Sequence, residues 1–288
     1  MKHSIYLIAL ITFTCILVGC SNYSYYYQVY ETTLPDNVKM DKTNLYYEDE
    51  TCKITYDFWS NGGDIGFAFY NKSDKYIYLN LEESFFIKNG VVYDYYKNRT
   101  YSSSQTLSTI NNASKETSSS LYLLNTPFML GSVGAVNSIS YYSSLYNSHS
   151  ESSEENKIIC IPPKTSRYFS EYKLTNSIYR SCNIYRYPGK KDANKEYFEL
   201  IQSPLRFGNI ISYSFKKNSE NLIRVENNFF VNSVTNYRKK DIVESRKINY
   251  CNDGYFEGSF FIDSVLAPNK FYIEYDNNGN DNYYYFSH

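Results

Sequence analysis

Histidine is nearly absent from this chain, and with it the side chain on which much acid–base and metal chemistry depends. The 288 residues include three histidines, and beyond His3 these are His149, in a serine-rich stretch, and His288, the last residue. A general base or a metal ligand needs a position fixed by packing and by a second orienting group. This scarcity argues against Ser-His-Asp, Cys-His and H-E-x-x-H sites. We therefore expect no enzyme, no catalytic residue, no metal and no cofactor.

An excess of charge of either sign is also missing. Lys and Arg number 29 against 30 Asp and Glu, a net charge of −1. Proteins that bind nucleic acid usually carry clustered positive charge, so we expect no nucleic-acid partner. Adjacent acids such as Glu82 and Glu83 point to opposite faces of a strand, which argues against a glycosidase-type pair of carboxylates.

Glycine and tryptophan are scarce, whereas aromatic residues are abundant. The chain has 12 Gly and a single Trp but 35 Tyr and 18 Phe, and aromatic side chains fit a pleated, half-buried surface. Residues 52–58 alternate between apolar and polar, as in a half-buried strand. Asn89-Gly90 lies between two apolar triplets, the strongest hairpin signal in the chain. These features predict an all-β fold.

A weak internal repeat is present. Residues 67–79 match residues 213–225 in aromatic spacing, turn residues and apolar return, and after a two-residue gap residues 84–87 match residues 228–231. Neighbouring residues on a strand face opposite ways, so we expect one ring of each Phe-Phe pair in these segments to lie in the core.

The repeat suggests a domain organisation. We predict two tandem immunoglobulin-like β-sandwich modules, at residues 45–175 and 198–288, with a linker at residues 176–197. The alternative is that the two copies are halves of one sandwich.

A long insertion interrupts the first module at residues 102–156. Two serine-rich runs flank an apolar centre, and loops of this length are usually functional or disordered. The alternative is that the apolar centre folds back and completes the core of the module. The candidates for contact with a partner are the large apolar side chains of this centre: Leu121, Leu123, Leu124, Phe128, Met129 and Leu130.

The N-terminus has the pattern of a signal peptide. Lys2 and His3 precede an apolar run at residues 5–18, which is too short to span a membrane as a stable helix. The run ends in Leu17-Val18-Gly19-Cys20, which resembles the lipobox of bacterial lipoproteins.

The resemblance implies a lipid anchor. Residues 1–19 would be removed as the signal peptide, and Cys20 would carry thioether-linked diacylglycerol and an amide-linked acyl chain such as palmitate. Residues 20–44 would form a lipidated tether. Ser21 resembles the signal for outer-membrane sorting, and no acidic run follows at residues 21–28. We therefore expect an outer-membrane lipoprotein on the periplasmic face rather than the cell surface.

The whole chain is similar to cell-envelope lipoproteins of unknown function from Gram-negative gut anaerobes. The likeness rests on the lipobox and on residues 67–87 and 161–165. It implies no activity and no site residues.

Four cysteines remain once Cys15 leaves with the signal and Cys20 is lipidated. Paired thiols persist in the oxidising environment of exported proteins, so we expect two disulfides. Sequence does not rank the three connectivities, and free, core-filling cysteines are the alternative. The candidates are Cys52, Cys160, Cys182 and Cys251.

Two basic clusters lie in predicted turns. One surrounds Pro188-Gly189 and includes Arg186 and Lys190, and the other is residues 238–240. Either can contact lipid phosphates, and solvated turns are the alternative.

Three functional classes remain open. The first is a membrane-anchored, non-catalytic binding or structural module of the cell envelope with a protein or glycan partner. The second is an accessory or subunit of a surface assembly, such as a pilus or a glycan-uptake system. The third is a glycan-active enzyme. The oligomeric state is not evident from the sequence.

Overall fold

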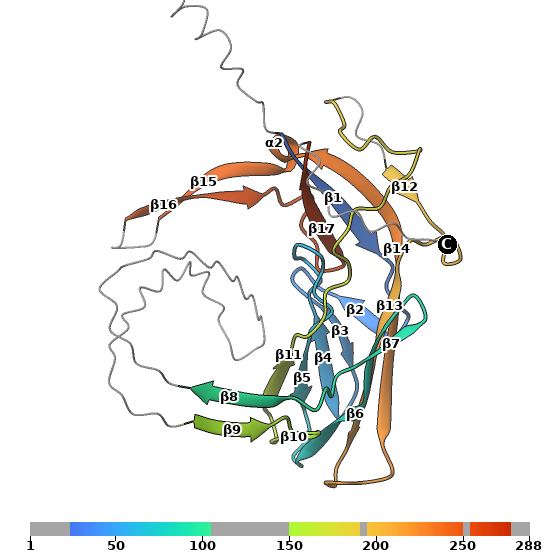
Figure 1. Cartoon of the computed structure of the whole chain (residues 1–288), viewed down its shortest axis with the longest axis vertical. Helices are drawn as coiled ribbons and strands as arrows, with labels where there is room; N and C mark the ends of the chain where they lie inside the picture. The colour runs from blue at the N-terminus through green and yellow to red at the C-terminus, as the bar shows by residue number, and fades with distance from the viewer. Residues whose placement is uncertain (1–23, 105–149, 191–194, 250–253, 278–288) are drawn as a thin grey trace, which may run out of the picture.

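A computed structural model of the protein describes residues 24–104, 150–190, 195–249 and 254–277. The regular structure of these residues is strand apart from one short helix, and the strands form two large sheets and two separate hairpins (Figure 1). All the pairings between strands are antiparallel. The all-β prediction is confirmed.

The larger sheet has eight strands and the smaller has five. In spatial order the larger sheet contains β10 (Ile158–Ile161), β6 (Ile77–Lys88), β13 (Arg206–Ser214), β14 (Ile223–Arg238), β1 (Tyr25–Thr32) and β17 (Lys270–Asp276), with β7 (Val91–Asp94) beside β6 and β12 (Lys195–Tyr197) beside β14. The smaller sheet contains β11 (Ser166–Phe169), β5 (Phe67–Asn71), β4 (Cys52–Tyr56), β3 (Leu45–Glu48) and β2 (Val38–Met40).

Two hairpins extend from the sheets. One joins β8 (Thr100–Ser104) to β9 (Ser150–Glu154), and the other joins β15 (Val243–Asn249) to β16 (Tyr255–Phe261). A single-turn helix, α2 (Lys239–Ile242), connects the end of β14 to β15. Figure 1 shows both hairpins projecting to the same side of the sheets.

The main core lies between the two sheets and is rich in aromatic rings. The ring centroid of Tyr56, from the small sheet, is 5.7 Å from that of Phe229 in the large sheet, and Phe69 and Tyr213 lie 5.4 Å apart in the same way. These four side chains are at most 2% exposed. Fully burying an apolar side chain such as Phe is worth about 1.5–3 kcal/mol, and contacts between paired rings add to this. This interface therefore holds the sandwich together.

The two predicted modules are joined in one sandwich. Strand β6, from the predicted first module, pairs with β13, from the second, from Phe207↔Lys88 to Ser214↔Tyr78. One continuous core cluster contains residues from both segments. The separate tandem modules at residues 45–175 and 198–288 are therefore not what the structure contains.

The repeated segments differ in their structural roles, which explains the discrepancy. The turn between β5 and β6 carries the chain from the small sheet to the large one, whereas β13 and β14 are adjacent in the same sheet. Alternating apolar residues and a polar turn look alike in both situations, because the pattern reports which face is buried and not which strand is the neighbour.

Each Phe-Phe pair buries one ring, as predicted. Phe86 and Phe229 are 2% exposed, and their neighbours Phe85 and Phe230 are only partly buried. The buried ring is the second of one pair and the first of the other. This offset arises because the register between β6 and β13 shifts near Ile210, which changes the phase of burial along β6.

The predicted hairpin at Asn89-Gly90 is confirmed. Lys88 pairs with Val91 across a two-residue turn in which Asn89 has φ 48° and Gly90 has φ 82°. Positive φ at both positions is what this kind of tight turn requires, and Asn and Gly adopt it at the lowest steric cost.

The predicted tether is instead part of the sheet. Strand β1 lies between β14 and β17. Tyr27 and Val29 pack on a small cluster with Ile242 and Val265, whereas Tyr30 packs in the main core. Both faces of β1 are covered, so its sequence does not alternate between polar and apolar residues and gives no strand signal.

The predicted linker at residues 176–197 also packs against the large sheet. The side chain of Gln28, in β1, accepts a hydrogen bond from the backbone N–H of Tyr179 at 2.6 Å and donates one to its carbonyl at 2.9 Å. Farther along, Asn236 donates to the Tyr185 carbonyl at 2.9 Å, and β12 pairs with β14. The described part of this segment is thus a surface layer of the sandwich.

Candidate functional site

The lipidation candidate and the partner-binding candidates lie outside the described residues. These are Cys20, in the N-terminal segment, and the apolar centre of the insertion: Leu121, Leu123, Leu124, Phe128, Met129 and Leu130. The described flanks of the insertion are β8 and β9, which pair from Thr100↔Glu154 to Ser104↔Ser150.

The two predicted disulfides are not present as a set. Cys251 lies outside the described residues. If all four cysteines formed two bridges, one bridge would have to join two of the other three. Cys52, Cys160 and Cys182 are all free thiols. The reason is their environment, because Cys52 is completely buried in the core beside Tyr213 while the other two are exposed. Burial, aided by the charge of Asp49, raises the pKa of the Cys52 thiol to about 12.

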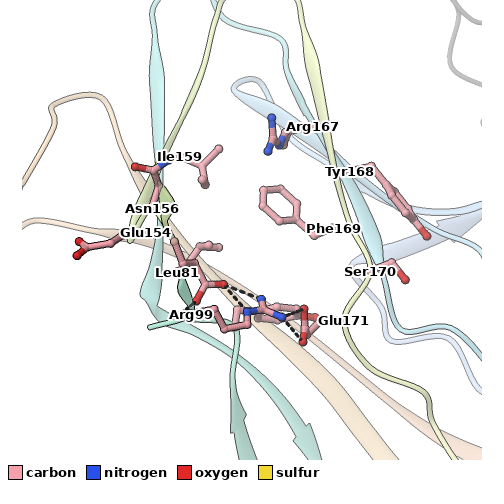
Figure 2. A pocket seen from close by; sticks show the side chains of 12 residues that line it. Leu81, Arg99, Glu154, Asn156, Ile159, Arg167, Tyr168, Phe169, Ser170 and Glu171 are labelled. Atoms are coloured by element: carbon pink, nitrogen blue, oxygen red, sulfur yellow. Dashed lines mark hydrogen bonds and ion pairs between the residues drawn. The ribbon is translucent and has the colours of Figure 1, made fainter. Parts of the chain in front are cut away.

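An ion triad fixes the base of the β8–β9 hairpin. Arg99 precedes β8, and its Nη2 lies 2.6 Å from Oε1 of Glu155, just after β9. Its Nη1 lies 2.9 and 3.0 Å from the two carboxylate oxygens of Glu171, which follows β11. Such charge-assisted, forked hydrogen bonds are geometrically specific, so the triad ties the hairpin to the edge of the small sheet (Figure 2).

Glu155 is the most strongly held member of the triad. Its Oε2 accepts hydrogen bonds from the backbone N–H groups of Lys97 at 2.8 Å and Arg99 at 3.2 Å, in addition to the guanidinium on Oε1. Partial burial acts to raise the pKa of Glu155, but these hydrogen bonds outweigh burial and lower it below its ordinary value. The hydrogen bond that Arg99 donates to Glu155 leads the contacts that raise the pKa of Arg99.

A pocket of about 400 Å³ lies beside this triad. It lies between the edge strands β10 and β11 of the two sheets. Leu81 from β6, Ile159 from β10 and Phe169 from β11 form an apolar part of its wall, and the rest of the lining is mostly polar or charged. In Figure 2 Arg99 and Glu171 lie at one end of the pocket and Arg167 at the other. Its volume falls within the ordinary range of small-ligand sites.

The two arginines of the pocket differ in their bonding. Arg99 is engaged by two carboxylates, whereas the exposed side chain of Arg167, on β11, makes no hydrogen bond or ion pair with any described residue. Neighbouring Tyr168 and Ser170 both donate to Oδ2 of Asp64, at 3.0 and 2.9 Å. Arg167 therefore presents a guanidinium that can accept a carboxylate or another anion.

The carboxyl group with a raised pKa lies outside the pocket. Among the carboxyl groups of the described ranges, Asp57 has a pKa raised to about 6, chiefly by burial, but its side chain does not line the pocket. The His, Cys, Asp and Glu side chains in these ranges form no group that could hold a metal ion. Within the same ranges, no helix has the length and apolar character needed to cross a bilayer.

Sequence reasoning missed every residue of the pocket. Arg99 and Glu155 are 56 residues apart in sequence, and Arg99 and Glu171 are 72 apart. No local spacing connects them, because the insertion separates the two strands of the hairpin. The one indication in the sequence was the insertion itself. The chain must leave and re-enter the domain at neighbouring points, so the residues at the two ends of the insertion lie close together.

Comparison with known proteins finds no counterpart: no family model, no curated protein and no solved structure matches this chain.

Proposed function

We propose that the protein is a lipid-anchored, non-catalytic binding module of the cell envelope. In this proposal Cys20 carries the lipid, the sandwich is the scaffold, and the pocket together with the adjoining insertion engages a protein or glycan partner. The observation that carries the binding role is the pocket between the two sheet edges, where an apolar wall lies beside the side chain of Arg167, which no described residue engages by a hydrogen bond or ion pair.

The bonding of the pocket carboxylates supports binding rather than catalysis. A glycoside hydrolase needs one carboxyl group held protonated as a general acid and a second one free to attack or to activate water. Of the three glutamates that line the pocket, Glu155 and Glu171 both bind Arg99, and the pKa of Glu155 is lowered, which leaves Glu154 without a second carboxylate to work with. The site is better suited to hold an anionic group at Arg167 while the remaining lining residues contact the rest of the ligand.

The edges of the sheets favour this role over that of an assembly subunit joined by strand addition. Strand addition needs a long open edge, and in the two large sheets the edge strands β10, β11 and β2 have only four, four and three residues. The longer β15 and β16, of seven residues each, form a separate two-stranded hairpin. The outer edge of β17 is partly covered, because Gly62 donates to the Tyr272 carbonyl at 2.8 Å and Tyr272 donates to the Ser60 carbonyl at 3.2 Å. Short or covered edges are how soluble sheets avoid such pairing.

The binding role is tested by removing the insertion at its natural boundary. Ser104 pairs with Ser150, so replacing residues 105–149 with Asn-Gly closes the hairpin and keeps the ion triad. We expect the thermal midpoint to change little while partners captured from envelope extracts are lost. The matched variant keeps the full length and replaces the six apolar candidates, residues 121–130, with serine. A collapsed midpoint, or an unchanged set of partners with both variants, contradicts the proposal.

The anchor is tested separately by labelling. Cys20→Ala should abolish incorporation of labelled palmitate and leave a product that fractionates without the membrane or keeps its signal peptide. Cys15→Ala, in the same segment, should change neither result, because it lies within the part that is removed. Palmitate incorporation into the Cys20→Ala protein would rule out the anchor.

A further inference from the structure

The structure brings two basic turns together at the end of the sandwich where β1 begins. The ring centroid of Tyr26 lies 5.2 Å from that of Tyr187 and 5.6 Å from that of Tyr275. The Tyr275 hydroxyl donates to the backbone carbonyl of Arg186, whose guanidinium lies 4.9 Å from the centre of the Tyr187 ring. These contacts hold the first basic turn, with Lys190, against the start of β1.

The second basic turn lies on the other side of the same strand end. Arg238 is opposite Tyr26 in the sheet, and the chain then enters α2, where Nζ of Lys239 lies 5.1 Å from the centre of the Tyr25 ring. Lys240 is exposed. Among the described residues, the acidic groups at this strand end are Asp241, which bonds Arg238 at 2.6 and 2.7 Å, Asp276, opposite Tyr25, and Glu274, opposite Tyr27. Basic side chains outnumber these three carboxylates, because Arg186, Lys190, Arg238, Lys239 and Lys240 all lie at the two turns.

We call the outer part of this region, which is exposed except for the half-buried Lys239, the anchor-end surface. It contains three lysines and three tyrosines, and the tyrosines are 40–64% exposed. Its residues are Tyr25, Tyr185, Tyr187, Lys190, Lys239 and Lys240.

The length of chain before β1 places this surface close to the proposed anchor. Tyr25 follows Cys20 by five residues, and a fully extended chain spans at most about 3.6 Å per residue. The start of β1 can therefore be no more than about 18 Å from the lipidated residue, less than the thickness of the hydrocarbon core of a bilayer.

We propose that the anchor-end surface docks on the headgroups of an anionic bilayer. This inference rests on the proposed lipid anchor at Cys20. Tyrosine rings concentrate at the depth of lipid headgroups, where the ring is in apolar surroundings and the hydroxyl is hydrated. Lysines close to the bilayer are attracted by anionic phosphates. The surface combines both chemistries within reach of the anchor.

Docking would fix the orientation of the protein on the membrane. Figure 1 shows the start of β1 at one end of the sandwich and the β13–β14 turn at the other, with β8, β9 and β10 displaced toward that far end. A sandwich that rests on the anchor-end surface thus points the pocket and the base of the insertion away from the bilayer. A tether alone would leave the orientation free.

The test is hydrogen exchange of the mature, acylated protein in vesicles. One set of vesicles is phosphatidylcholine alone and the other contains phosphatidylglycerol. We expect amide exchange in residues 185–190 and 237–242 to slow by at least about threefold in the anionic vesicles, with the difference disappearing at high salt. Exchange in the basic turn at residues 216–221, at the far end of the sandwich, should be equal in both.

Matched variants sharpen the test. Lys190→Glu, Lys239→Glu and Lys240→Glu combined should abolish the difference between the two vesicles, whereas Lys216→Glu with Lys217→Glu, which reverses the two lysines of the far turn, should leave it intact. If the protein partitions into both vesicles but its exchange is equal in the two, the docking surface is wrong and the proposed anchor is unaffected. A protein that partitions into neither vesicle overturns the anchor, and this inference with it.

Discussion

The interior of the sandwich and the pocket at its edge are held together by different forces. Between the sheets, rings such as Phe58 and Phe229 pack 5.0 Å apart with almost no exposure, and no charged side chain is among the buried residues of the described ranges. At the pocket, Arg99 and two glutamates form the main contacts and remain partly hydrated. Apolar burial therefore fixes the fold, and charge fixes where the insertion is attached.

The largest effect is expected in the interior. Phe229→Ala removes a ring that contacts Tyr56 and Phe58 across the core and Phe207 on the neighbouring strand, and we expect a loss of about 3–5 kcal/mol in the free energy of unfolding. Phe230→Ala, at the partly buried neighbour, should cost much less. Denaturant unfolding measures both. Equal losses at the two positions would contradict the assignment of inward and outward rings.

A smaller effect is expected at the ion triad. Glu155→Ala leaves two backbone N–H groups without their acceptor and the Arg99 guanidinium with Glu171 alone, which should cost about 1–3 kcal/mol. Glu83→Ala, which removes an exposed ion pair with Arg224, should cost less than about 1 kcal/mol. If the Glu83 variant loses more stability than the Glu155 variant, the triad does not hold the hairpin.

The triad also predicts a dependence on pH. The folded-state pKa of Glu155 lies below its ordinary value of 4.5, so the unfolded chain takes up a proton first as the pH falls. The stabilisation is therefore complete above that ordinary value and is lost as the pH falls through the lowered pKa. The difference in unfolding free energy between the wild type and Glu155→Gln should shrink from about pH 6 to about pH 3. A constant difference would mean that the carboxylate charge contributes nothing.

The interior was easier to predict from sequence than the pocket, for a physical reason. Period-two alternation and the Asn89-Gly90 turn are local properties, and both predicted real strands. The pairing of β6 with β13 was missed because alternation does not encode the neighbouring strand. Strand β1 was missed because burial of both faces removes the alternation altogether.

The pocket could not be predicted because it depends on residues distant in sequence. Arg99, Glu155 and Arg167 are ordinary surface residues in the sequence, and they converge only because β10 and β11 bring two sheet edges together. The disulfide prediction was wrong as a set for a related reason. Cysteine spacing does not reveal that Cys52 faces the core while Cys160 and Cys182 face solvent.

The most direct test of the account is to reverse the charge of Arg167 in the pocket and to measure how much partner the protein captures. Arg167→Glu should lower the amount of partner captured from envelope extracts by at least about tenfold, because one engaged guanidinium–anion contact is worth more than 1.4 kcal/mol. Arg206→Glu, at an exposed position on β13 away from the pocket, should capture as much as the wild type. Equal capture by the wild type and both variants would contradict a binding role for the pocket.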